Sequence, residues 1–223
     1  ARAAYDRALA RAARRTARSA SGMRASSLQM ESWLREEREA NLFVRAWRAD
    51  TAGNLVCGDA CESLEEYLEA FRHTLAVLQD PRAMRRVARE LVEDVARENI
   101  RYMEVRFSPI LHDLRGHDMA EILDAVLAGL DEASRATGVA TGVILCGIRS
   151  MPPEKSLALA DLCVQYKGRG VVGFDLAGAE LNHPAKLHGG AFQKILDHNI
   201  NCTCHAGEGY GPASIHQALH ALG

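Results

Sequence analysis

One stretch organises this chain. It is strand-like and ends in a histidine, two small residues and a carboxylate: Asn201-Cys202-Thr203-Cys204-His205-Ala206-Gly207-Glu208. Apolar and polar residues alternate along it at the period of a β-strand, so His205 and Glu208 are expected at the strand's carboxyl end. A neutral imidazole is a common zinc ligand, and a glutamate beyond a turn-forming glycine can face the same metal-bound water. The stretch therefore indicates a metal-dependent hydrolase. The alternative is a strand that ends at a glycine turn with a solvated glutamate.

The sequence before this stretch alternates between strands and helices. Strands are predicted at residues 100–107, 143–146 and 171–176, and helices at 119–136, beyond Pro153, around 192–196 and after Pro212. Such alternation predicts an α/β fold with a parallel sheet, and the nearly continuous apolar strands predict that both faces of the sheet are covered. In a parallel α/β barrel, the carboxyl ends of the strands carry the chemistry.

Polar residues gather where each predicted strand ends. They are Arg106 and Ser108, then Arg149, then Asp175, Gly178 and Glu180, and finally His205 and Glu208. If the strands form a barrel, these residues surround one pocket at a single rim. Ordinary capping and turn chemistry explains Arg106 and Asp175 equally well.

Roughly the first hundred residues read as helical. Residues 1–22 form an arginine-rich, acid-poor segment that we interpret as an extension outside the main domain, either frayed or a transit-type sequence, which leaves residues 23–223 as one domain. A Ser-x-x-Glu capping box at Ser63 and Glu66 predicts a helix start. Pro81 opens another helix, whose predicted apolar stripe is Met84, Val87, Leu91 and Val95.

Composition excludes several classes of partner. Of the 223 residues, 48% are hydrophobic and 25% charged, which is typical of a soluble globular protein. Lys and Arg (27) nearly balance Asp and Glu (29), so we expect no nucleic-acid partner. No apolar run approaches the ~20 residues that a membrane span needs. The six cysteines include no Cys-x-x-Cys pair, which favours reduced thiols in a cytoplasmic protein.

Three of the strand ends carry motifs that resemble the adenosine deaminase family. They are Tyr102-Met103-Glu104-Val105-Arg106-Phe107-Ser108-Pro109, Gly173-Phe174-Asp175-Leu176-Ala177-Gly178-Ala179-Glu180 and His205-Ala206-Gly207-Glu208. The resemblance runs from about Met23 to Gly223. It implies a TIM (β/α)8-type barrel that holds one zinc ion and hydrolytically deaminates a purine nucleoside, with adenosine, adenine and a nucleotide all open as substrates.

The resemblance also implies roles for three residues. His205 would be a zinc ligand, Glu208 would protonate the purine ring nitrogen next to the attacked carbon, and Gly178 would offer its backbone N–H to another ring nitrogen. Zinc would make a hydroxide nucleophile available at neutral pH. Glu208 would have to be protonated to act as an acid, which requires burial in the purine pocket.

The chain also departs from the family's pattern. The family's first strand carries His-x-His, whereas Thr16-Ala17-Arg18 contains no histidine, and Ala179 stands where the family usually has aspartate. We therefore expect strands two to five of eight, an incomplete zinc site, and a chain deficient in deamination. The alternative is a non-catalytic relative or fragment that binds a purine or a partner.

Two further expectations concern the rest of the chain. His216 and His220 have the i, i+4 spacing of a helical zinc pair, and surface polarity accounts for His112 with His117 and for His183 with His188. An open four-stranded sheet would expose unpaired edges and an apolar inner face, and would promote self-association.

Overall fold

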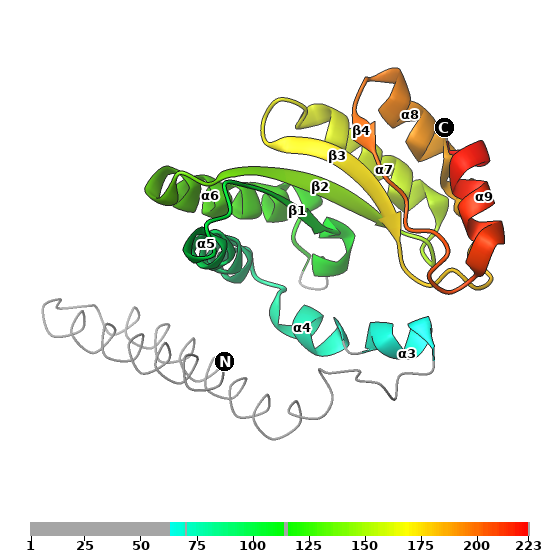
Figure 1. The fold of residues 1–223 in the computed structure, drawn as a ribbon, viewed down its shortest axis with the longest axis horizontal. Helices are drawn as coiled ribbons and strands as arrows, with labels where there is room; N and C mark the ends of the chain where they lie inside the picture. Colours follow the sequence, from blue (N-terminus) through cyan, green and yellow to red (C-terminus); the bar gives the residue numbers. More distant parts are fainter. Residues whose placement is uncertain (1–62, 70, 114–115, 223) are drawn as a thin grey trace, which may run out of the picture. The chain divides into compact units, whose positions relative to one another are not determined.

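A computed structural model describes residues 63–69, 71–113 and 116–222, all within one compact unit. Its strands form one parallel sheet in the order β1-β2-β3-β4 (Figure 1). The strands are β1 (Tyr102–Phe107), β2 (Ala140–Ile148), β3 (Val171–Ala177) and β4 (Asn201–Cys202). The predicted α/β alternation and parallel pairing are confirmed. The N-terminal extension and the first predicted helix lie outside the described residues.

The described helices are α3 (Leu64–Glu69), α4 (Phe71–Val77), α5 (Pro81–Arg97), α6 (Met119–Thr137), α7 (Pro153–Gln165), α8 (Gly189–Asp197) and α9 (Gly211–Ala221). Helix α3 begins at the predicted capping box, and α5 begins at the predicted Pro81. The Ser63 hydroxyl accepts a hydrogen bond from the Glu66 N–H at 3.1 Å, as the capping box predicts. Gly138 ends α6 with a left-handed φ of 77°. No described helix is long and apolar enough to cross a bilayer.

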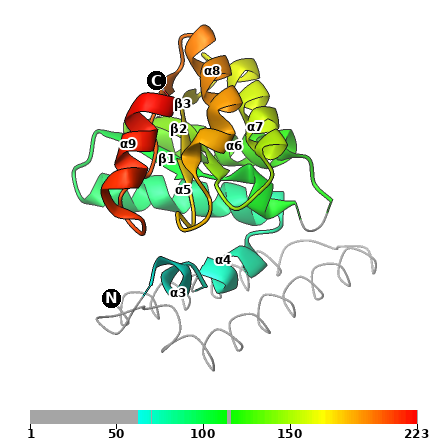
Figure 2. The ribbon, with the colours of Figure 1, turned by 90° about the vertical axis from the view of Figure 1, so that its right-hand side faces the viewer.

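Helices α6, α7 and α8 pack against one face of the sheet, and α5 packs on α6 (Figures 1 and 2). The core lies in this layer. Phe174 of β3 meets Phe192 of α8 edge to face, with ring centroids 5.2 Å apart, and both rings are almost fully buried. On β1, the side chains of Met103, Val105 and Phe107 pack against the same core.

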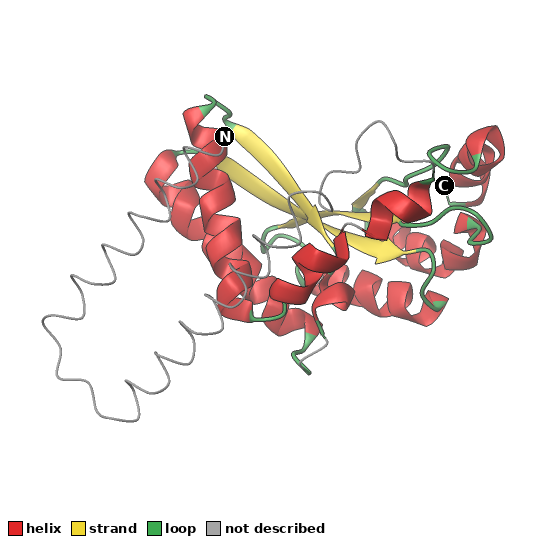
Figure 3. Ribbon diagram, turned by 90° about the horizontal axis from the view of Figure 1, so that it is seen from below, coloured by secondary structure: helices red, strands yellow, loops and turns green. Residues whose placement is uncertain are grey.

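The face of the sheet opposite these helices exposes polar side chains at its two outer strands, β1 and β4 (Figure 3 shows the strands from below). Side chains alternate along a strand, so Tyr102, Glu104 and Arg106 of β1 are exposed while their neighbours are buried in the core. At the other edge, Asn201 and Thr203 are exposed too. The prediction that the outer strands present an apolar inner face is therefore wrong for these residues. The alternation of polar residues in β1 already carried this information. In the central strand β3, consecutive residues from Gly173 to Leu176 are buried, so both of its faces are covered there, as predicted.

A bulge in β3 orients the carboxylate that lies at the centre of the site. Val143 pairs with Val171 but Ile144 pairs with Gly173, so β3 contains one extra residue at this point. The extra residue changes which side chains face the helices. Val171 and Phe174 both belong to the core, and Asp175 is left to contact side chains of the opposite face.

Helix α5 buries only part of its predicted stripe: Met84 and Val95 contact the core, but Val87 and Leu91 do not. Its buried residues are Met84, Ala88 and Val92, whereas Val87 is 46% exposed and Leu91 38% exposed. Small residues explain the difference. A Cβ atom on Gly129 of α6 would lie 2.1 Å from the Arg85 carbonyl oxygen and 3.1 Å from the Ala88 Cβ, so the two helices pack backbone to backbone.

Candidate active site

Asp175, at the end of β3, connects side chains from three other strands. Its carboxylate is fully buried and lies 3.0 Å from the His205 Nδ1, just beyond β4, and 3.2 Å from the Arg106 Nη1 on β1. The Cys146 thiol of β2 donates to the same oxygen at 3.6 Å. Residues that the sequence spreads over about a hundred positions therefore meet at the carboxyl ends of the strands, as predicted.

The contact between Asp175 and His205 changes the acidity of both groups. Burial alone would raise the pKa of Asp175, but the bonds that its carboxylate accepts, chiefly from His205 and Thr203, outweigh burial and lower it. The same hydrogen bond raises the pKa of His205 against the opposing effect of burial. Because Asp175 engages Nδ1, Nε2 is the ring nitrogen available to a metal.

A second charged pair lies deeper, at the ends of β2 and β3. The side chains of Arg149 and Glu180 are each only 1% exposed. Arg149 donates from Nη2 to the backbone carbonyl of His205 and, at 3.5 Å, to the Cys204 Sγ. Glu180 accepts from the backbone N–H groups of Gly209 and Tyr210 at 3.1 and 2.8 Å. Burial would raise the pKa of Glu180, but these N–H groups and the nearby Arg149 charge lower it.

Gly178 and Glu208 lie at the same ends of the sheet as His205. Gly178 directly follows β3 with a φ of +101°, a conformation that favours glycine. Gly207 has a φ of +86°, and a Cβ atom there would lie 2.8 Å from the Ile215 side chain, so the turn that presents Glu208 requires glycine. Glu208 itself is exposed, and its charge contributes to the raised pKa of His205. The expected burial of Glu208 is not seen in the described residues. The catalytic, purine-binding and zinc-binding roles remain predictions.

The described residues contain no complete metal site. No three His, Cys, Asp or Glu side chains come together as a metal site in residues 63–69, 71–113 and 116–222. His205, with a buried carboxylate behind its imidazole, fits the usual arrangement of a zinc-binding histidine. A catalytic zinc needs three protein ligands and a water, so His205 can be only one of them. On α9, His216 and His220 are exposed, with ring centroids 4.4 Å apart.

Two other histidines are buried, which corrects the interpretation from surface polarity. His112 is 4% and His188 1% exposed. The Ser156 hydroxyl lies 2.8 Å from the His188 Nδ1, and the His188 Nε2 lies 3.2 Å from the Arg149 carbonyl oxygen. Sequence patterns gave no sign of this burial, because both histidines follow prolines in apparent loops.

The fold and site together define a class of α/β protein in which a parallel sheet presents polar side chains at the carboxyl ends of its strands. A sequence model described as adenosine deaminase matches residues 48–223, and the chain belongs to the adenosine deaminase family. The adenosine deaminase of Mycobacterium avium strain 104 is 44% identical over 164 residues, which cover 72% of this chain and 45% of that protein. This chain therefore spans less than half the length of the curated relatives that it matches.

Solved structures agree on the fold. An amidohydrolase from Burkholderia ambifaria with bound Zn superposes with a TM-score of 0.67 at 25% identity, covering 76% of this chain and 45% of that one. The N6-mAMP deaminase MAPDA of Arabidopsis gives a TM-score of 0.70 at 26% identity, covering 88% and 59%. Arabidopsis ADAL complexed with IMP gives 0.68 at 29% identity, covering 77% and 52%. The four-stranded sheet is thus part of a TIM-type deaminase barrel, as expected.

Proposed function

We propose that this chain supplies one side of the active site of a zinc-dependent deaminase, which hydrolyses the 6-amino group of a purine nucleoside to give inosine and ammonia. His205 binds the zinc ion, Glu208 protonates the purine ring, and Gly178 donates its N–H to another ring nitrogen. The observation that carries the proposal is the 3.0 Å contact between Asp175 and His205 at the carboxyl ends of the strands. His205 precedes Glu208 by three residues, so the same short loop carries both. Zinc, when bound, acts as a Lewis acid that activates water.

The protein's own residues prepare the site in two ways. Asp175 holds the His205 imidazole in the orientation and tautomer that direct Nε2 outward. The Arg106 guanidinium, 3.2 Å from Asp175, holds that carboxylate in turn. Gly207 forms the turn that places Glu208 at the exposed end of the loop, where a substrate can reach it.

The names of the structural neighbours support the metal and the class of ligand. One is described with bound Zn, and the ADAL structures are complexes with IMP and GMP. We infer a small-molecule purine as the partner of this chain, with adenosine as the first substrate to test and adenine and a nucleotide as the alternatives. We place the activity in the cytoplasm, because Cys146, Cys163, Cys202 and Cys204 are free thiols.

The test is the loss of adenosine absorbance as inosine forms. The 223-residue chain should show no turnover above background even with added zinc, because one histidine cannot hold a catalytic metal. A version extended with the family's first and last strands should deaminate adenosine, and should lose activity on Glu208→Gln. Zinc-dependent turnover by the 223-residue chain that His205→Ala abolishes would show that its site is already complete.

A second candidate function is non-catalytic binding of a purine or a partner. It is favoured by the two outer strands, β1 and β4, each of which pairs with a neighbour on one side only among the described strands. Such edges can pair with a second copy of the chain. Stoichiometric zinc in the purified chain favours the enzyme, whereas self-association without zinc, measured by light scattering, favours this alternative.

A further inference from the structure

The loop between β4 and α9, residues 203–210, carries both His205 and Glu208. Its first residues are bonded to β3, because the Thr203 and His205 N–H groups donate to the carbonyl oxygens of Phe174 and Leu176 at 2.9 and 3.0 Å, and the turn around Glu208 lies beyond these bonds. No helix or regular strand includes it. Gly207 and Gly209 give its backbone freedom without adding side-chain contacts. A site built on such a loop needs support from elsewhere in the fold, because catalytic groups must be held closely in place.

That support comes from Arg149 and Glu180, which follow the two central strands. We call them the positioning pair. Their side chains are each only 1% exposed, so neither charge is solvated by bulk water. Arg149 holds the carbonyl of His205 near the start of the loop, and Glu180 holds the N–H groups of Gly209 and Tyr210 at its end.

Both side chains hydrogen-bond to the backbone of the loop, but they do not hydrogen-bond to each other. The Arg149 Nη2 lies 3.8 Å from the Glu180 Oε1, which is too long for a hydrogen bond. An Arg–carboxylate pair formed for its own attraction is commonly bidentate at shorter distances. Among the described residues, the Arg149 Nε and the Glu180 Oε1 accordingly have no hydrogen-bond partner, while the atoms that face the loop do. The loop backbone bridges the pair.

We propose that Arg149 and Glu180 are positioning residues that fix the loop on both sides of Glu208, and thereby set the placement of Glu208 relative to His205. The catalytic meaning of that placement rests on the proposed function. Neither residue reaches the reacting atoms. Arg149 acts through the His205 carbonyl and Glu180 through the two amides that follow Glu208.

The first test uses the full 223-residue chain and needs no activity. Amide hydrogen exchange is measured by mass spectrometry on peptides that span residues 203–212, for the parent, Glu180→Gln and Glu180→Leu. Glutamine keeps an acceptor oxygen without the charge, whereas leucine keeps neither. Relative to any change in β2 and β3, exchange in the loop should become faster by about tenfold or more in Glu180→Leu, and by less in Glu180→Gln.

A matched control separates positioning from general loss of stability. Ile122→Val removes one methyl group from a fully buried side chain of α6, away from the loop. It should lower the melting temperature without selectively accelerating exchange in residues 203–212. Loop exchange that both Glu180 variants leave within about twofold of the parent would overturn the proposal.

The second test uses the extended version that is expected to deaminate adenosine. Glu180→Gln should lower kcat by up to about 10²-fold and change KM much less, because displacement of a catalytic group affects the transition state more than substrate binding. Ile122→Val should leave kcat unchanged. An unchanged kcat in Glu180→Gln overturns the positioning role. Absence of turnover in the parent and the variant alike counts against the proposed function alone, and the exchange measurement then decides the positioning role.

Discussion

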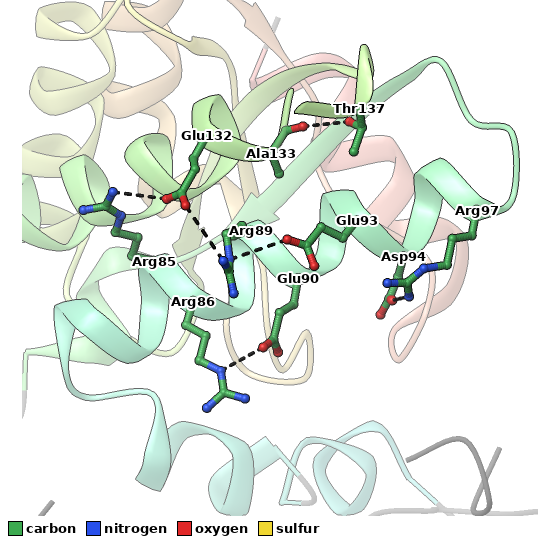
Figure 4. A network of polar contacts seen from close by, with 10 residues as sticks. All are labelled: Arg85, Arg86, Arg89, Glu90, Glu93, Asp94, Arg97, Glu132, Ala133 and Thr137. Carbon is green, nitrogen blue, oxygen red and sulfur yellow. Dashed lines mark hydrogen bonds and ion pairs between the residues drawn. The ribbon is translucent and has the colours of Figure 1, made fainter. Parts of the chain in front are cut away.

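Two charged networks of this protein use similar side chains in opposite surroundings. On the surface of α5 and α6, arginines and glutamates form a series of ion pairs that we call the exposed ladder (Figure 4). It includes Arg85 with Glu132 at 3.1 Å and Arg86 with Glu90 at 2.8 Å. These four side chains are between 44% and 64% exposed. Arg149 and Glu180 are 3.8 Å apart, but each is only 1% exposed.

The distance between two charges therefore does not by itself predict how much an ion pair contributes to stability. Exposed pairs compete with water and salt, and typically contribute about 0–1 kcal/mol. Breaking a buried pair leaves the remaining charge without compensation, which typically costs about 3–5 kcal/mol. The shorter contacts on α5 and α6 should therefore matter less than the longer contact beneath the β4–α9 loop.

The largest effect is expected from Arg149→Met. This change keeps much of the side-chain volume, but leaves the buried Glu180 carboxylate and the His205 carbonyl without their cationic partner. We expect the free energy of unfolding to fall by about 3–5 kcal/mol in urea denaturation. A loss below about 1 kcal/mol would show that the buried pair contributes no more to stability than an exposed ion pair does.

The next largest effect is expected where the ladder's two helices touch. In Gly129→Ala, the new Cβ would lie 2.1 Å from the Arg85 carbonyl oxygen, so α5 and α6 must separate. We expect a loss of about 1–3 kcal/mol in the same denaturation experiment. Gly190→Ala in α8 is the control, because its Cβ would meet no atom within 4 Å and should be neutral or stabilising. Equal results for both variants would show that close packing does not hold these helices together.

A smaller effect is expected from pH, through the buried histidine beside Arg149. Burial is the main cause that lowers the pKa of His188, and the Arg149 charge adds to it. The unfolded chain therefore binds a proton near pH 6.5 that the folded chain does not, and stability falls as the pH drops below about 6.5. His188→Gln should reduce this slope between pH 7.5 and 5, in unfolding measured against the parent at each pH. A slope that stays the same in the variant would show that His188 does not contribute to it.

The smallest effect is expected on the exposed ladder. Glu132→Gln removes the carboxylate that Arg85 and Arg89 approach at 3.1 and 3.8 Å, and should change the free energy of unfolding by less than about 1 kcal/mol. Added salt should reduce this difference further, while the loss in Arg149→Met should hardly change. A loss in Glu132→Gln as large as that in Arg149→Met would contradict the comparison.

The sequence by itself determined the alternation of strands and helices, several helix caps and the parallel pairing of the strands. Hydrophobic periodicity and the residues of caps and turns are local signals, so β1, α6 and the cap at Gly138 could be predicted to within a residue or two. The candidate site was identified in the same way, because polar residues at the ends of apolar strands must meet when those strands run parallel. The motif around His205 and Glu208 added the chemistry.

Only the tertiary structure decided which residues contact one another and which faces are buried. Val87 was predicted in the core of α5 but is exposed, because Gly129 and Ala88 let the helices approach along another face. His188 appeared to be a surface residue, but it is buried beside Ser156. Arg149 and Glu180 are 31 positions apart, and the sequence placed both at strand ends without showing that they are buried or which groups they contact. They come together because parallel pairing of β2 and β3 brings their carboxyl ends to the same place, where the loop after β4 supplies the hydrogen bonds that make two buried charges tolerable.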